Sequence, residues 1–251
     1  MRIYYFTSTG NSLYVAKKIK EKIEDCELIS IAKALKNKEF EVEEESIGFI
    51  YPIHCGSLPI VVEEFIGKLE LKGSEYIFAI GVTGGGEAKS SFPHINEILK
   101  NNEISNYLTV KYISNYTRAG RNPTKERALK AIESQEQIIE DFIESLKLRE
   151  IKKVDYKLGK QLIYNGWKTY FKNKDKAFNV NEDCISCEMC KKICPVDDIE
   201  MINNKPSWLG KCTDCMACIN ICPKKAINIG KKTVKKNRYI NPHIKAYELI
   251  E

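Results

Sequence analysis

Eight of the chain's ten cysteines lie between residues 184 and 222, in two segments that have the same internal spacing. The segments are CISCEMCKKICP at 184–195 and CTDCMACINICP at 212–223. The opening RIYYF has no secretory-signal pattern, and no apolar run approaches the roughly 20 residues of a membrane span. We therefore expect a cytoplasmic protein without a membrane span. In that reducing compartment, clustered cysteines are typical of metal sites rather than of disulfides.

Each segment has the spacing C-x2-C-x2-C-x3-C-P, which resembles the motif of bacterial two-cluster ferredoxins. In that motif the fourth cysteine binds the cluster of the other segment. The resemblance implies two 4Fe-4S clusters, one held by Cys184, Cys187, Cys190 and Cys222 and the other by Cys212, Cys215, Cys218 and Cys194. Zinc is the main alternative, because C-x2-C pairs are common in zinc sites and two ions could use all eight thiols. Zinc would require neither the third cysteine at a further x2 step nor the x3-C-P ending.

The cysteine segments belong to a small repeated unit. CPVDDIEMI at 194–202 and CPKKAINIG at 222–230 each place a short strand pattern directly after Cys-Pro. The two copies predict a pseudo-twofold unit, which we place in a small α+β domain at 178–251 that includes a C-terminal extension. Such a small domain buries little apolar surface, so we expect the metal to supply much of its folding free energy.

The first 150 residues have a different pattern, in which short apolar runs alternate with amphipathic ones. We expect strands at 2–6, 26–31, 46–52, 75–82 and 107–113, and helices at 12–23, 59–69, 91–100 and 125–146. Five strands that alternate with helices predict an α/β domain at 1–150, with a parallel sheet covered on both faces. In such doubly wound sheets the ligand lies beyond the carboxyl ends of the strands.

The loop TSTGNS, between the first strand and its helix, is rich in groups that bind phosphate. It offers backbone N–H groups, hydroxyls and one amide around a glycine, in Thr7, Ser8, Thr9, Gly10, Asn11 and Ser12. A helix N-terminus favours a phosphate there, and no lysine is required. The alternative is an ordinary helix cap, although a single residue would satisfy a cap. The loop matches neither the Walker motif nor G-x-G-x-x-G.

Two further loops follow strands at the same edge of the sheet, and both combine glycine with exposed backbone amides. A flat ring with polar edges requires such backbone if the chain is to approach it closely. The candidate residues are Tyr51, Pro52, Ile53, His54, Cys55 and Gly56 in YPIHCGSLP, and Thr83, Gly84, Gly85 and Gly86 in VTGGGEAKSS. We expect His54 to be a surface histidine and Cys55 a small buried side chain, with the backbone making the contacts.

These three loops resemble those of the flavodoxin family, which has the strand order 2-1-3-4-5 and binds FMN where that order reverses. The resemblance covers residues 1–150. It implies that residues 7–12 hold the FMN phosphate and that the other two loops flank the isoalloxazine ring. Flavodoxins usually stack aromatic side chains on this ring, and within these loops Tyr51 is the one candidate.

Residues 151–177 are expected to form a connector between the two domains. The segment is rich in Lys and Tyr and has no long Gly/Ser tract, so we expect it to be partly helical rather than a flexible tether. Aromatic side chains are expected to pack it against one of the domains, namely Tyr164, Trp167, Tyr170 and Phe171.

The charge of the chain is unevenly distributed. Residues 1–150 hold 20 Lys and Arg against 23 Asp and Glu, a net −3, whereas residues 151–251 hold 20 against 11, a net +9. No base-stacking aromatic array or helix-turn-helix pattern accompanies the lysines, so we expect no nucleic-acid binding. The basic half is instead the expected docking surface for a redox partner protein.

The whole chain resembles fusions of a flavodoxin with a bacterial ferredoxin. The resemblance implies an electron carrier that passes electrons between FMN and two 4Fe-4S clusters and on to a partner. One alternative is an FMN-dependent reductase of a small oxidised substrate, with SNYTRAGR at 114–121 supplying Asn115, Tyr116, Arg118 and Arg121 beside the flavin. Another is an N-terminal domain that binds no flavin and serves as a scaffold.

Overall fold

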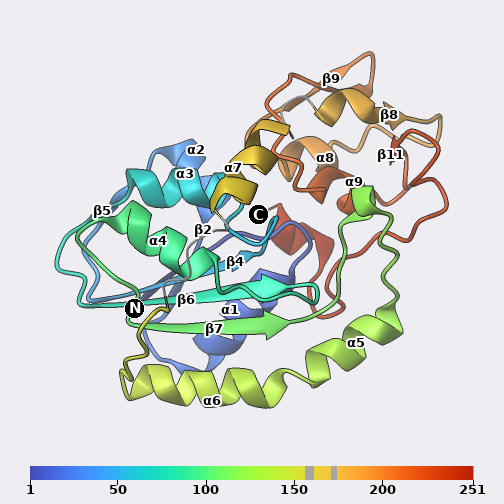
Figure 1. Cartoon of the computed structure of the whole chain (residues 1–251). Helices are drawn as coiled ribbons and strands as arrows, with labels where there is room; N and C mark the ends of the chain where they lie inside the picture. The colour runs from blue at the N-terminus through green and yellow to red at the C-terminus, as the bar shows by residue number, and fades with distance from the viewer. Residues whose placement is uncertain (156–160, 171–173, 251) are drawn as a thin grey trace.

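The N-terminal half of the computed structural model is a five-stranded parallel sheet between two layers of helices (Figure 1). The structure describes residues 1–155, 161–170 and 174–250. The strands of the sheet are β1 (Arg2–Tyr5), β2 (Glu27–Ser30), β4 (Ser46–Pro52), β6 (Tyr76–Thr83) and β7 (Asn106–Lys111). Their order is β2-β1-β4-β6-β7, which is 2-1-3-4-5 when the five are numbered by themselves. The predicted doubly wound sheet is therefore confirmed.

Helices cover both faces of this sheet and bury a separate core on each. One layer holds α1 (Asn11–Lys22), α5 (Lys125–Glu133) and α6 (Glu136–Lys147), and the other holds α2 (Ile31–Asn37), α3 (Ile60–Lys68) and α4 (Ser91–Leu99) (Figure 1). Along β4, Phe49 belongs to the core under α2, α3 and α4, and the next residue, Ile50, to the core under α1 and α6. This alternation explains why strands buried on both faces appear in the sequence as continuous apolar runs.

The sequence prediction missed several short elements. The helix expected at 125–146 is divided between α5 and α6, and at the break the Gln135 side chain accepts a hydrogen bond from the backbone N–H of Lys111 (2.9 Å). Helix α2 has only seven residues, too few for a clear periodic pattern. The two-residue strands β3 (Glu41–Val42) and β5 (Glu70–Leu71), which pair in parallel, were also not predicted.

The cysteine-rich module consists of two similar halves. Its elements are β8 (Phe178–Val180), α8 (Met189–Lys192), β9 (Ile199–Ile202), β10 (Lys205–Trp208), α9 (Ala217–Ile221) and β11 (Ile227–Ile229). Strand β8 pairs antiparallel with β11, and β9 with β10. Left-handed backbone recurs at matched positions of the two halves: 186 and 214, 188 and 216, and 197 and 225. The predicted repeat, with a short strand after each Cys-Pro, is confirmed.

The two halves of the chain are joined by a connector and by a returning C-terminal segment. Helix α7 (Gln161–Tyr170) lies between the N-terminal domain and the cysteine-rich module (Figure 1), and its Tyr164 is fully buried, whereas Tyr170 is 67% exposed. Phe171 and part of the connector lie outside the described residues. Beyond β11 the chain returns to the N-terminal domain, where the backbone N–H of Asn241 donates to the carbonyl of Thr9 (2.8 Å). In the portion of the chain that the structure covers, no helix has both the length and the apolar character that a membrane crossing requires.

Candidate functional site

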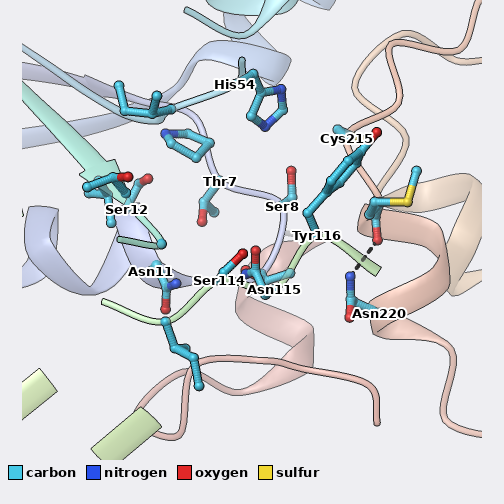
Figure 2. Close-up of a pocket in the computed structure, with 18 of the residues that line it drawn as sticks. Thr7, Ser8, Asn11, Ser12, His54, Ser114, Asn115, Tyr116, Cys215 and Asn220 are labelled. Atoms are coloured by element: carbon cyan, nitrogen blue, oxygen red, sulfur yellow. Dashed lines mark hydrogen bonds between the residues drawn. The ribbon is translucent and has the colours of Figure 1, made fainter. Parts of the chain in front are cut away.

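A cavity of about 390 Å³, here called the central cavity, lies at the carboxyl ends of the strands. Many of the residues predicted to bind a cofactor line it: Thr7, Ser8, Thr9, Asn11 and Ser12 from the first loop, Pro52, Ile53, His54 and Cys55 from the second, and Thr83 and Gly84 from the third. Figure 2 shows Thr7, Ser8, Asn11, Ser12 and His54 around one space, together with Cys215 and Asn220 of the cysteine-rich module. The parallel sheet brings the three loops to one edge, as the sequence pattern requires.

The remaining predicted residues do not line the central cavity: Gly10, Tyr51, Gly56, Gly85 and Gly86. Tyr51 is fully buried in the core, and its hydroxyl lies 2.9 Å from Ser91 Oγ. The expectation that Tyr51 stacks on a ring is therefore wrong, because period-2 alternation turns its side chain into the helix layer. Gly10 has a positive φ of 91° at the start of α1, and a Cβ there would lie 3.0 Å from Ile244 of the C-terminal segment.

The side chains of His54 and Cys55 also differ from expectation. The ring of His54 lines the cavity edge-on to Trp167, at a centroid distance of 6.2 Å, and burial lowers its pKa to about 4. His54 is therefore neutral at neutral pH. Cys55 is exposed and has a positive φ of 47°, so the expectation of a buried side chain is wrong.

The first loop has the features of a phosphate site. Helix α1 begins at Asn11, and the N–H of Gly10 donates to Thr7 Oγ1 (2.9 Å), which fixes the turn before the helix. Within the described residues, the hydroxyls of Ser8 and Ser12 are buried and have no hydrogen-bond partner. Unsatisfied hydroxyls at a helix N-terminus fit the oxygens of a phosphate group. A larger residue would not fit at Gly10, because its φ favours glycine and the C-terminal segment fills the space.

Several residues that complete the central cavity were not predicted as binding residues: Val82, Ile113, Trp167, Asp214, Met216 and Asn220. Ser114, Asn115 and Tyr116, which also line it, belong to the loop that was considered only for the reductase alternative. Asn115 donates from Nδ2 to Thr9 Oγ1 (2.6 Å), so the loop after β7 supports the first loop. The aromatic sequence around Trp167 was the one available signal. The other positions depend on how the two halves pack, which local sequence patterns do not report.

A buried ion pair connects the N-terminal domain to the cysteine-rich module. Asp214, with a fully buried side chain, accepts hydrogen bonds from Arg118 (Nε–Oδ1 2.8 Å and a second contact at 2.6 Å) and from the hydroxyl of Tyr116. Burial raises the pKa of Asp214, while the bonds from Arg118 and Tyr116 oppose that rise. Because Asp214 directly precedes Cys215, the ion pair fixes a cysteine loop against the central cavity.

The eight clustered thiols divide between two small cavities. The outer cysteine set, defined as Cys184, Cys187, Cys190 and Cys222, lines one cavity, and the inner cysteine set, defined as Cys194, Cys212, Cys215 and Cys218, lines the other. Each cavity therefore combines three cysteines of one segment with the fourth of the other. No group of three or more His, Cys, Asp or Glu among the described residues converges as ligands of a single metal ion do.

The surroundings of the thiols fit iron–sulfur clusters. The backbone N–H groups of Asp198, Asp214 and Ala226 donate to thiol sulfurs, at N–Sγ distances of 3.3, 3.4 and 3.3 Å respectively. The reduction potential of a cluster depends on hydrogen bonds to its sulfurs and on the apolar residues that surround it. Burial raises the pKa of Cys190 to about 11 and that of Cys215 to about 12. A cationic metal would favour the thiolate form and so oppose this effect of burial.

Cys215 lies on the wall of the inner cavity and also on the wall of the central cavity. Met216 is shared in the same way. The outer cysteine set lies nearer the solvent, since Cys187 is exposed and the neighbouring Ile185 is 57% exposed. The three cavities therefore follow one another from the first loop toward the surface of the cysteine-rich module.

Comparisons with known proteins agree with this division. A family model of the flavodoxin domain matches residues 2–113, and one of the 4Fe-4S dicluster domain matches residues 176–223. A protein of an ion-translocating oxidoreductase complex from Methanosarcina acetivorans is 36% identical over 63 residues, 25% of this chain and 24% of that protein. A ferredoxin from Pyrobaculum islandicum is 43% identical over 47 residues, 18% of this chain and 44% of that protein. The chain spans less than half the length of these curated relatives.

Solved structures similar to this chain include flavoproteins. A flavoprotein in complex with FMN from Lactobacillus acidophilus is 15% identical, with a TM-score of 0.33, covering 43% of this chain and 91% of that one. Rubredoxin oxygen:oxidoreductase from Desulfovibrio gigas is 14% identical, with a TM-score of 0.37, covering 59% of this chain and 36% of that one.

The two family matches coincide with the two structural units. The first covers the sheet and the three loops at its edge, and the second covers all eight clustered cysteines. The dicluster match favours iron–sulfur clusters over zinc ions. The chain thus joins a flavodoxin domain, matched at 2–113, to a 4Fe-4S dicluster domain, matched at 176–223.

Proposed function

We propose that this protein is an electron carrier, which binds FMN in the central cavity and exchanges electrons between it and two 4Fe-4S clusters. When bound, FMN supplies two-electron chemistry that the one-electron clusters lack. The observation that carries the proposal is the position of Cys215, on the walls of both the central cavity and the inner cysteine cavity. A cluster ligand would therefore border the flavin site.

The residues that would hold FMN follow from the lining of the central cavity. Residues 7–12 would take the phosphate, through the helix N-terminus and the free hydroxyls of Ser8 and Ser12. The ring would lie between the loops that contain His54 and Gly84. Trp167 borders the same space and supplies the aromatic side chain that Tyr51 does not.

The two clusters would be held with crossed ligands, one by the outer and one by the inner cysteine set. The lining of the two small cavities supports this arrangement, since each contains the four thiols of one set. The exposure of Cys187 makes the outer set the point of exchange with a partner. The inner set would then relay electrons to and from the flavin side.

The carrier is favoured over the reductase because neither candidate anion-binding arginine is available at the central cavity. Arg118 is paired with Asp214, and Arg121 does not line the cavity. The partner would be a redox protein with an acidic face, since residues 151–251 carry a net charge of +9 (20 Lys and Arg minus 11 Asp and Glu). The rate of electron exchange with such a partner should fall as the salt concentration rises.

The domain boundaries are part of the proposal. We place the flavodoxin domain at 1–150, the connector at 151–177 and the dicluster domain at 178–251. Helix α6 ends at Lys147 and β8 begins at Phe178, which supports these limits. The C-terminal extension belongs to the dicluster domain by sequence, although it packs on the first loop.

An anaerobic reductive titration of the reconstituted protein, with flavin and iron counted afterwards, tests the proposal. We expect one FMN and about eight irons per chain, four for each set of four thiols. After rapid reduction of one centre, electrons should reach the others at a rate independent of protein concentration. Iron without bound flavin, or exchange only between separate molecules, would contradict the carrier mechanism.

A further inference from the structure

The side chain of Asn11 in the phosphate loop is held by the C-terminal segment. Its Oδ1 accepts hydrogen bonds from the hydroxyl of Tyr239 (2.8 Å) and from Nδ2 of Asn241 (3.0 Å). All three residues are buried, with exposed fractions of 7%, 3% and 1%. These contacts join positions about 230 residues apart in the chain.

The direction of this hydrogen-bond chain is set by a backbone group. The N–H of His243 donates to Oδ1 of Asn241 (3.0 Å), and a backbone N–H cannot become an acceptor. Asn241 must therefore turn its Nδ2 toward Asn11. Asn11 must in turn present Oδ1 to Asn241, which leaves its own Nδ2 on the opposite side of the amide. The orientation of the Asn11 amide, usually ambiguous, is thereby determined.

The Nδ2 end of the Asn11 amide, which is not bonded to the C-terminal segment, belongs to the proposed flavin site. Asn11 is the first residue of α1, and it lines the central cavity beside Ser12 (Figure 2). A flipped amide would present an oxygen, which repels a phosphate oxygen, whereas the observed orientation presents two N–H donors. Asn241 also holds the loop backbone, through its N–H bond to the carbonyl of Thr9 (2.8 Å).

We propose that Asn241 and Tyr239 are positioning residues for the phosphate of the bound flavin, acting by orienting the Asn11 amide as a donor. This inference rests on the proposed function, because it assumes that the central cavity binds FMN. The phosphate site of the first domain is then incomplete without the C-terminal segment. Affinity for the phosphate-bearing flavin depends on residues outside the flavodoxin domain.

The decisive variant is Asn241→Asp, which keeps the size of the side chain but replaces its only donor with an acceptor. Asn11 should then flip, turning Nδ2 toward the new carboxylate and Oδ1 toward the phosphate. We expect the Kd for FMN to rise about tenfold or more, the effect of losing one hydrogen bond to a charged group. The Kd for riboflavin, which lacks the phosphate, should change little. Tyr239→Phe should show a smaller shift of the same kind.

The measurement is anaerobic titration of cluster-loaded, flavin-stripped protein with FMN and with riboflavin, followed by flavin fluorescence. Asn237→Asp is the matched control, since it adds the same charge to the same segment but its partners are Asn122 and Pro123. In an Asn11→Ala background, Asn241→Asp should have no further effect on the ratio of the two Kd values.

Three results would overturn the inference: equal weakening of both flavins, no change in the FMN affinity, or an undiminished effect of Asn241→Asp when Asn11 is absent. An undiminished effect without Asn11 would mean that the added negative charge alone weakens FMN binding. A wild-type protein that binds neither flavin would instead overturn the proposed function itself. A wild type that binds both, with variants that do not distinguish them, would overturn only the role of Asn241 and Tyr239.

Discussion

Helix α7, which brings Trp167 to the central cavity, is fastened to the flavodoxin domain through one carboxylate. Glu63 on α3 accepts hydrogen bonds from the Tyr164 hydroxyl (2.9 Å) and Lys168 Nζ (2.6 Å), and its other oxygen lies 3.6 Å from Nε2 of His94. Burial by itself would raise the pKa of Glu63. The bonds from His94, Lys168 and Tyr164 outweigh burial and lower the pKa from 4.5 to about 2.

This shift gives the magnitude of the expected effect. The difference between 4.5 and about 2 is roughly 2.5 pKa units, and at about 1.36 kcal/mol per unit it corresponds to about 3 kcal/mol of stability. Solvent screening of the partly exposed carboxylate makes this value an upper limit. Because the pKa is lower in the folded state, the stabilisation is fully present above pH 4.5 and is lost as the pH falls through 2. We expect Glu63→Gln to remove up to this amount at neutral pH, since an amide loses the charge.

Hydrogen exchange of α7 is the appropriate assay, because it reports local opening of a helix as well as global unfolding. In Glu63→Gln, the amides of α7 should exchange about ten- to a hundredfold faster, and the ratio to wild type should stay constant between about pH 6 and 8. The matched control is Glu64→Gln, whose exposed pair with Lys68 (2.5 Å) contributes under about 1 kcal/mol. Equal effects of the two variants, or a ratio that changes across this pH range, would refute the role assigned to Glu63.

Four other variants test the cluster ligands, the domain contact and the sheet. Cys194→Ser should lose the cluster held by the inner set, and Cys222→Ser the cluster held by the outer set. Iron analysis and electron paramagnetic resonance measure the loss. If each variant instead lost the cluster bound by its own sequence segment, crossed ligation would be disproved. Arg118→Gln should lower stability by about 3 kcal/mol, because it removes the arginine that neutralises the buried Asp214 carboxylate; a thermal melt unchanged from wild type would count against this. Gly48→Ala should destabilise the protein by about 1–3 kcal/mol or more, because a Cβ there would lie 2.2 Å from an aromatic ring of β6; chemical denaturation measures the loss, and an unchanged midpoint would contradict it.

The local patterns of the sequence were sufficient for the sheet and the cysteine repeat. Each strand of the sheet is an apolar run, and the order of the strands follows from the resemblance of the first loop to that of flavodoxins. The eight cysteines have a spacing that few other sites share, so their grouping was also accessible. Both signals are contained in short stretches of chain.

The part of the site that could not be predicted depends on packing between distant segments. Tyr51 was the expected aromatic neighbour of a flavin, but the twist and pleat of β4 turn it into the core. Trp167 reaches the cavity only because α7 docks on Glu63, and Asn241 reaches Asn11 only because the C-terminal segment returns to the first domain. No periodicity or residue spacing in the sequence indicates these contacts between distant segments.

The contact between Asn241 and the first loop has a consequence for the order in which the molecule is assembled. During synthesis, domains near the N-terminus generally fold first. Residues 7–12 are made well before residues 239–241, so Thr9 and Asn11 acquire these partners only after Tyr239 and Asn241 have left the ribosome. The contacts of the first loop are therefore completed only once the cysteine-rich module has been synthesised.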